Sequence, residues 1–184
     1  MLEWIALGIA AVIGTTVVVK KLIKKDGTDV GTVDREMAKN YYFEVWSSKN
    51  GPRFRLKKVE DEDILLHGEA YSSFAALNDT LSLLAKATGI EVRGEINDID
   101  STVDEELGSS YYFEVWASKN GPRFRLKHTN GEIVLHGEAY SSLEALNEKL
   151  TPLVEATGIE ARYTLDVPAD DNADEIADAE IVEE

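Results

Sequence analysis

The sequence predicts an α+β protein: two tandem β-β-β-α-β modules packed about a pseudo-twofold axis, behind one N-terminal transmembrane helix. Three observations predict this fold class. One segment occurs twice with a single substitution, and each copy is followed by apolar residues at helical spacing. An uncharged apolar run also lies near the N-terminus.

The repeat sets the boundaries of the modules. Residues 41–57 read YYFEVWSSKNGPRFRLK, and residues 111–127 repeat them except that Ala117 replaces Ser47. The two copies then share HGEAYSS, ALN and ATGIE in the same order. Self-similarity this close indicates duplication and predicts modules over residues 41–96 and 111–165.

Each copy opens with a segment that predicts a β-hairpin. If Trp46 faces Arg53, apolar residues pair on one face of the hairpin and acid pairs with base on the other. The resulting pairs are Val45–Phe54, Glu44–Arg55, Phe43–Leu56 and Tyr42–Lys57, repeated as Trp116–Arg123, Val115–Phe124, Glu114–Arg125 and Phe113–Leu126. Asn50-Gly51 and Asn120-Gly121 supply the positive φ of a tight loop.

The rest of each module predicts a third strand, a helix and a last strand. The third strands are residues 64–67 and 133–136, and the last strands are residues 90–96 and 159–165. Ser72 or Ser73 caps the first helix, which Gly89 ends. Pro152 predicts a kink or break in the second helix. We expect one antiparallel sheet per module, with its helix on the apolar face.

The N-terminal segment, residues 1–25, predicts a membrane anchor. Residues 4–19 carry no charge, and residues 2–23 would span about 33 Å as a helix. The lysines that follow this run place the modules on the cytoplasmic side of the membrane. The alternative is an apolar helix packed inside a larger soluble assembly. Residues 26–40 are interpreted as a spacer, 97–110 as an acidic linker and 166–184 as a disordered acidic tail.

Composition narrows the classes of function. The 184 residues contain 35 Asp and Glu against 19 Lys and Arg, a formal net charge of −16. This charge repels phosphate backbones and makes nucleic acid an unfavourable partner. The absence of cysteine excludes disulfides, thiolate nucleophiles and cysteine-based zinc sites, and suits a reducing compartment.

Both modules resemble the YegP-like family of small prokaryotic proteins, a domain of unknown function. The resemblance lies in the aromatic-led first strand, the R-F-R-L strand at 53–56, and G-E-x-Y-S-S at 68–73 and 137–142. It implies a sheet-plus-helix repeat that pairs with its twin. It brings no assigned catalytic residue, cofactor or ligand. Strongly acidic members from salt-loving microbes offer a simple reason for the negative charge.

The polar face of the two hairpins is the candidate binding face. Its residues are Tyr42, Trp46, Arg53, Arg55, Tyr112, Trp116, Arg123 and Arg125. One interpretation is a basic-aromatic platform for an anionic or nucleic-acid ligand. The favoured interpretation is ordinary cross-strand pairing on a solvated or intermodule face, which accounts for each residue. Exposure of Trp46 and Trp116 distinguishes the two, and we expect at least partial burial.

No other residues predict a catalytic or metal site. His67 and His136 lack a third ligand, so a structural role is favoured over a metal site. Glu69 and Glu138 suit a capping or turn role, and Ser72-Ser73 a helix cap. The sequence thus predicts a noncatalytic membrane-tethered interaction module, without metal or cofactor, that binds a protein partner or itself. The alternatives are a polyanion or nucleic-acid binder and an enzyme of unrecognised type.

Overall fold

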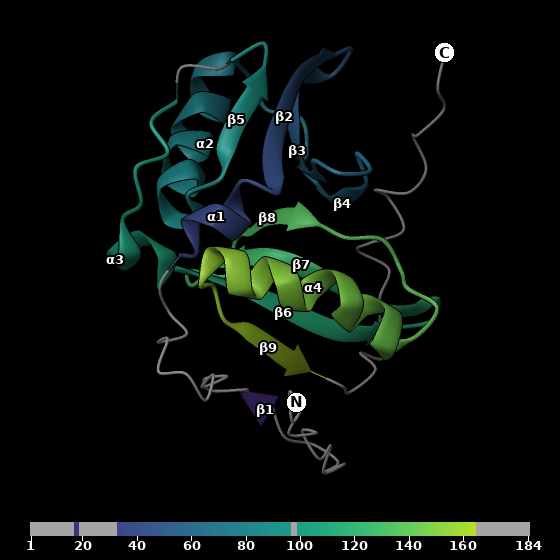
Figure 1. The fold of residues 1–184 in the computed structure, drawn as a ribbon. Coiled ribbons are helices and arrows are strands. Elements are labelled where there is room, and N and C mark those ends of the chain that lie inside the picture. The colour runs from purple at the N-terminus through teal and green to yellow at the C-terminus, as the bar shows by residue number, and fades with distance from the viewer. Residues whose placement is uncertain (1–16, 19–32, 97–98, 165–184) are drawn as a thin grey trace.

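The computed structural model describes residues 17–18, 33–96 and 99–164 (Figure 1). The first module contains β2 (Tyr41–Ser48), β3 (Gly51–Lys58), β4 (Ile64–His67), α2 (Phe74–Thr88) and β5 (Glu91–Gly94). The second contains β6 (Tyr111–Ser118), β7 (Gly121–His128), β8 (Ile133–His136), α4 (Leu143–Thr157) and β9 (Ala161–Thr164). The remaining elements are β1 (Val17–Val18), α1 (Arg35–Ala38) and α3 (Glu105–Gly108). Each module therefore follows the order β-β-β-α-β.

The predicted hairpin register is confirmed in both modules. Glu44 lies opposite Arg55 and Trp46 opposite Arg53, and the second hairpin repeats these pairs. The ladder continues to Ser48 and Gly51, so only two residues form the loop. Gly51 takes a φ of 123°, and a Cβ there would lie 2.2 Å from the carbonyl oxygen of Tyr71. This close approach requires glycine at the hairpin turn.

The sheet differs from the prediction of one antiparallel sheet per module. All strands lie in one mixed sheet, in the order β1-β9-β6-β7-β8-β4-β3-β2-β5. The modules join edge to edge where His67 on β4 pairs with His136 on β8. The last strands β5 and β9 run parallel to β2 and β6. Helix α2 returns the chain to the end of the sheet where β4 began, so β5 runs in the same direction as β4 and β2.

The predicted single-pass membrane helix is also wrong. Among the residues that the structure describes, no helix is long and apolar enough to cross a membrane. Most of the predicted anchor, residues 1–25, lies outside the described residues. Its two described residues, Val17 and Val18, form β1, which pairs with β9. Valine is typical of strands, so an apolar run rich in valine does not distinguish a helix from a strand. The cytoplasmic placement of the modules stays a prediction.

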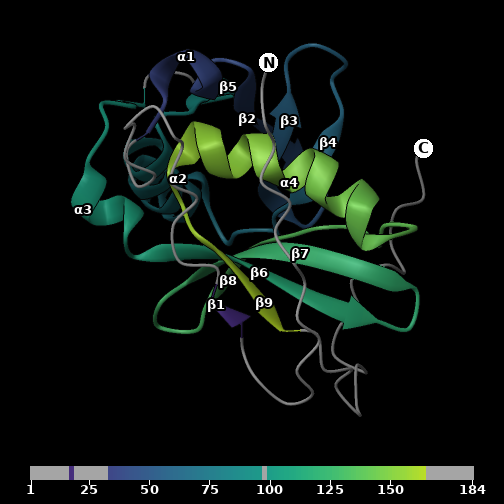
Figure 2. The same ribbon diagram turned by 60° about the horizontal axis from the view of Figure 1, so that its bottom comes forward.

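Helices α2 and α4 pack on the apolar side of the sheet and enclose one continuous core (Figures 1 and 2). Phe43 meets Phe54 edge to face with ring centroids 5.9 Å apart, and Phe113 and Phe124 repeat the contact at 6.2 Å. The side chains of Ser73 and Ser142 cap the two helices, and Gly89 and Gly158 end them in the left-handed conformation. Helix α4 is continuous through Pro152, so the expected break is absent.

Two short helices, α1 and α3, lie in the segments interpreted as spacer and linker. The carboxylates of Asp34 and Asp104 each accept two backbone N–H groups at their starts. Helix α1 packs against α4 of the second module, where the Asp34 N–H donates to the Ala156 carbonyl at 3.1 Å. Helix α3 packs against α2, and the Asp104 N–H donates to the Lys86 carbonyl. Each short helix therefore precedes one module and packs on the other.

Candidate binding face

A row of charged and titratable side chains crosses the sheet from one module to the other. Strand by strand, the row is Arg162, Glu114, Arg125, His136, His67, Arg55, Glu44 and Arg93. Phe43 and Val45 face the core, so Glu44 between them points to the opposite side of the sheet. We call the surface that carries this row the polar sheet face. The order of residue types is the same from either end of the row, so the two histidines lie at its centre.

Each glutamate of the row holds two cations of the neighbouring strand. The Arg55 Nε donates to Glu44 at 2.5 Å, and the Lys57 Nζ lies 3.6 Å from the same carboxylate. In the second module the corresponding distances from Glu114 to Arg125 and Lys127 are 2.6 and 3.4 Å. These pairs are partly buried, so they are screened less than surface pairs. They fix the orientation of the arginines.

The aromatic residues of the predicted face are covered by guanidinium groups. Arg55 lies over Trp46 with its Cζ 4.8 Å from the ring centroid, and Arg93 lies over Tyr42 at 4.3 Å. The second module repeats both contacts, with Arg125 over Trp116 at 4.4 Å and Arg162 over Tyr112 at 3.9 Å. These distances suit cation–π contacts. The rings therefore support the arginines and offer little free face for stacking a base.

Trp46 and Trp116 show the partial burial that we expected. Trp116 is 5% exposed, and Trp46 is partly buried. Neither lies in the seam between the modules, however, because β4 and β8 make that seam and the tryptophans are on β2 and β6. The eight predicted face residues thus share one side of the sheet, in two clusters separated by the seam.

His67 and His136 form the centre of the row. Each imidazole lies beside a carboxylate of the other module: His67 Nε2 is 3.8 Å from Glu138, and His136 Nε2 is 3.6 Å from Glu69. Burial lowers the pKa of His67, the Glu138 charge opposes this shift, and the charges of Arg55, Arg53 and His136 add to it. His67 therefore favours the neutral form. The contacts of Glu69 and Glu138 across the seam were not predicted, because they depend on how the modules pair.

The remaining side chains of this region bear on what it can hold. Among residues 33–96 and 99–164, no group of three or more His, Cys, Asp or Glu side chains could hold a metal ion. The hydroxyls of Ser73 and Ser142 accept backbone N–H groups at the helix starts. The Arg53 Nε is buried and has no hydrogen-bond acceptor among the described residues. A guanidinium in this state favours an anionic neighbour.

A groove of about 640 Å³ lies beyond the edge strand β5, away from the seam. Arg35, Lys39 and Arg93 line it together with Glu91 and Asp100. Arg93 forms an ion pair with Glu91, and Asp100 pairs with Lys86 at 3.7 Å. One cation of the groove, Arg93, is thus already paired with a carboxylate at the groove wall. The centre of the row joins residues of both modules, so we place the candidate site there.

Comparison with known proteins bears on the family of the chain. No curated protein matches it. It is similar to the solution structure of UPF0339 protein SO3888 from Shewanella oneidensis, with 21% identity, a TM-score of 0.43, and coverage of 70% of this chain and 92% of that one. It is also similar to the solution structure of the E. coli protein of unknown function yegP, with 17% identity, a TM-score of 0.40, and coverage of 72% and 97%.

A family match falls in the second module. Residues 117–148 match the domain of unknown function DUF1508. The matched segment runs from the end of β6 through β7 and β8 into α4, and so includes Arg125 and His136 of the row. The expected resemblance to the YegP-like family is thereby confirmed: part of the second module matches DUF1508, a domain of unknown function.

Proposed function

We propose that the chain is a noncatalytic interaction module whose polar sheet face binds an acidic segment of a protein partner. The observation that carries this proposal is the excess of cations on that face of a chain whose net charge is −16. Cationic side chains in and beside the row outnumber the carboxylates. The cations are Arg53, Arg55, Lys57 and Arg93 with Arg123, Arg125, Lys127 and Arg162, and the carboxylates are Glu44, Glu62, Glu69, Glu91, Glu114, Glu138 and Glu160.

The surroundings of the face favour a protein ligand over nucleic acid. Single-stranded nucleic acid binds by stacking bases on free aromatic rings, but here guanidinium groups cover the rings. The overall negative charge also repels a long phosphate backbone. A short acidic peptide needs only local cations, because the remaining charge of the chain is screened beyond about 8 Å at physiological salt.

The test is the binding of a labelled oligoglutamate peptide to the full chain, measured by fluorescence anisotropy at low salt. The Arg53→Gln, Arg123→Gln double variant removes two face cations and leaves the Glu44 and Glu114 pairs intact. We expect it to weaken binding about tenfold or more. Charge-assisted hydrogen bonds contribute about 1.5–3 kcal/mol each, and 1.4 kcal/mol corresponds to a factor of ten.

The matched control is Lys58→Gln, Lys86→Gln, which removes the same charge from positions outside the row. We expect this variant to bind the peptide like the unmodified chain. Equal losses in the two variants would show that only net charge matters and would refute the proposed face. Tighter binding of single-stranded DNA than of the peptide would favour the polyanion alternative instead.

A further inference from the structure

The four central positions of the row contain no carboxylate. Arg55, His67, His136 and Arg125 follow one another across β3, β4, β8 and β7. Neighbouring strands lie about 4.8 Å apart, so this cationic and titratable segment spans about 14 Å. Glu44 and Glu114 lie outside it, each paired with its own arginine. The two histidines are thus enclosed by arginines on both sides.

His67 faces more positive than negative groups. Arg53, Arg55 and His136 face His67, which has Glu138 as its only carboxylate among the charges that shift its pKa. On the other side of the seam, Arg125 pairs with His136, and Glu69 is the carboxylate beside it. Positive groups therefore outnumber negative ones around His67, and protonation of the imidazoles adds to the positive charge of the seam.

Glu69 and Glu138 show how a ligand carboxylate could sit at the seam. Their side chains are 79% and 76% exposed, and they lie 3.6 and 3.8 Å from the imidazoles, beyond ordinary hydrogen-bond distance. Exposed ion pairs of this kind contribute about 0–1 kcal/mol, so an incoming carboxylate can displace them at little cost. The cations below them, by contrast, are held in place by the Glu44 and Glu114 pairs.

We infer that the seam between the modules is a carboxylate-binding site for an acidic polypeptide, and that binding there takes up a proton on His67. This inference rests on the proposed function and deepens it, because it names the binding centre on the face and its regulation by pH. The site is incomplete in either module alone, since each contributes one histidine and its flanking arginines.

Proton uptake follows from the surroundings of the imidazoles. Burial and the nearby arginines lower the pKa of His67, so the free protein holds it neutral near pH 7. A carboxylate bound between the imidazoles favours the charged form of His67 and raises its pKa. Affinity must then increase as the pH falls from 7.5 to 5.5, whereas glutamate carboxylates stay largely ionised in this range. A rise of one pKa unit at one histidine corresponds to about a tenfold gain in affinity.

The experiment combines histidine titration by NMR with binding of the oligoglutamate peptide to the full chain. We expect the peptide to raise the pKa of His67 and to leave the resonances of His128 unmoved. His128 lies at the end of β7 against Tyr111 and serves as an internal control. We also expect the affinity for the peptide to increase about tenfold or more between pH 7.5 and 5.5.

Variants separate this inference from the proposed function. The His67→Gln, His136→Gln double variant should lose the gain in affinity between pH 7.5 and 5.5, and His128→Gln should keep that gain. Binding that is independent of pH, with unchanged histidine pKa values, would overturn the seam site and leave the interaction module standing. Absence of peptide binding at every pH would overturn both.

Discussion

The Glu44→Gln substitution tests whether the row holds the sheet together. Glu44 accepts a hydrogen bond from Arg55 at 2.5 Å and lies 3.6 Å from Lys57, whose side chain is only 7% exposed. Without the carboxylate, that nearly buried ammonium keeps the exposed Glu62, at 3.2 Å, and its contact with the Tyr42 ring. Hydrogen bonds between charged groups contribute about 1.5–3 kcal/mol, so we expect the free energy of unfolding to fall by about 2 kcal/mol.

Urea denaturation followed by circular dichroism measures this change, as a shift of the midpoint at constant slope. The control is Glu36→Gln, whose carboxylate is 83% exposed and pairs with Lys39 at 2.7 Å. That variant should lose less than about 0.5 kcal/mol. Equal losses in the two variants would contradict a structural role for the row. Glu44→Arg should also be destabilising, and adding Arg55→Glu should restore part of the loss because the pair is re-formed in reverse.

Three further changes test the turns, the caps and the buried phenols. Gly121→Ala should lower the melting temperature far more than Gly131→Ala. Both positions have a positive φ, but only a Cβ at 121 meets a carbonyl oxygen, at 2.1 Å, and thermal melting of the two variants compares them. Ser142→Ala should cost about 1 kcal/mol in urea by removing the cap of α4, and no loss would exclude that role. Burial raises the pKa of Tyr140 to about 12, so its contribution to stability is complete below pH 10 and is lost as the pH rises toward 12. Stability measured across this range should depend less on pH in Tyr140→Phe, and an unchanged profile would contradict the assignment.

The local elements could be predicted from the sequence because their signals are local. The alternation of Phe43, Glu44 and Val45 against Phe54 and Arg55 allows only one register, since a slip of one residue would place charges in the core. The third strands and the helix ends follow from short motifs of the same kind. The direction of β5 and β9 is not local. A short strand after a helix pairs in either direction, and only the path of the helix over the sheet decides which.

The short helices α1 and α3 could have been predicted from the repeat. The residues Thr-Val-Asp occur at 32–34 and at 102–104, each the same distance before Tyr-Tyr-Phe. Asp34 and Asp104 stand at the helix N-caps, where aspartate is a preferred residue. The repeat unit thus begins before the first strand of each module. Its packing on the opposite module could not be predicted, because the contact joins residues far apart in the sequence.

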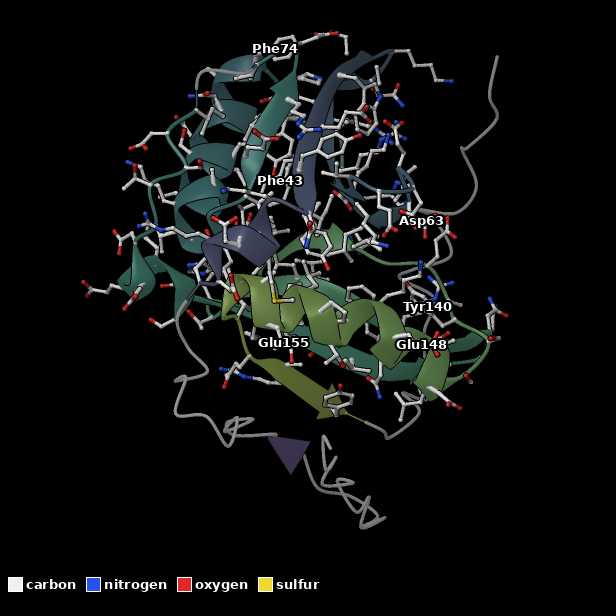
Figure 3. All side chains as sticks on the ribbon, viewed as in Figure 1. Phe43, Asp63, Phe74, Tyr140, Glu148 and Glu155 are labelled. Carbon is white, nitrogen blue, oxygen red and sulfur yellow. The ribbon has the colours of Figure 1, made fainter. Side chains whose placement is uncertain are left out.

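The seam itself depends on tertiary contacts that no single module contains. Lys149 on α4 donates to Asp63, before β4, at 2.5 Å, and Asp63 and Tyr140 line a shallow depression beside β4 (Figure 3). Beneath the row, a Cβ on Gly137 would lie 3.3 Å from Leu66, so the apolar core also passes through the seam. These contacts fix the distance between the two modules and hence between their histidines.

Duplication within one chain has a consequence for recognition at this seam. The motif HGEAYSS is identical in the two copies, whereas the loops before β4 and β8 differ in length and charge. The centre of the row is therefore made of the same residues on both sides, and its surroundings are not. A ligand with two carboxylates could contact both histidines at once, while the unequal loops decide the direction in which an acidic segment lies across the sheet. Exchange of residues 59–63 for residues 129–132 should thus alter the choice among acidic peptides and leave the pH dependence of binding unchanged. A change in that pH dependence would show that the loops, and not the seam, set the protonation of the histidines.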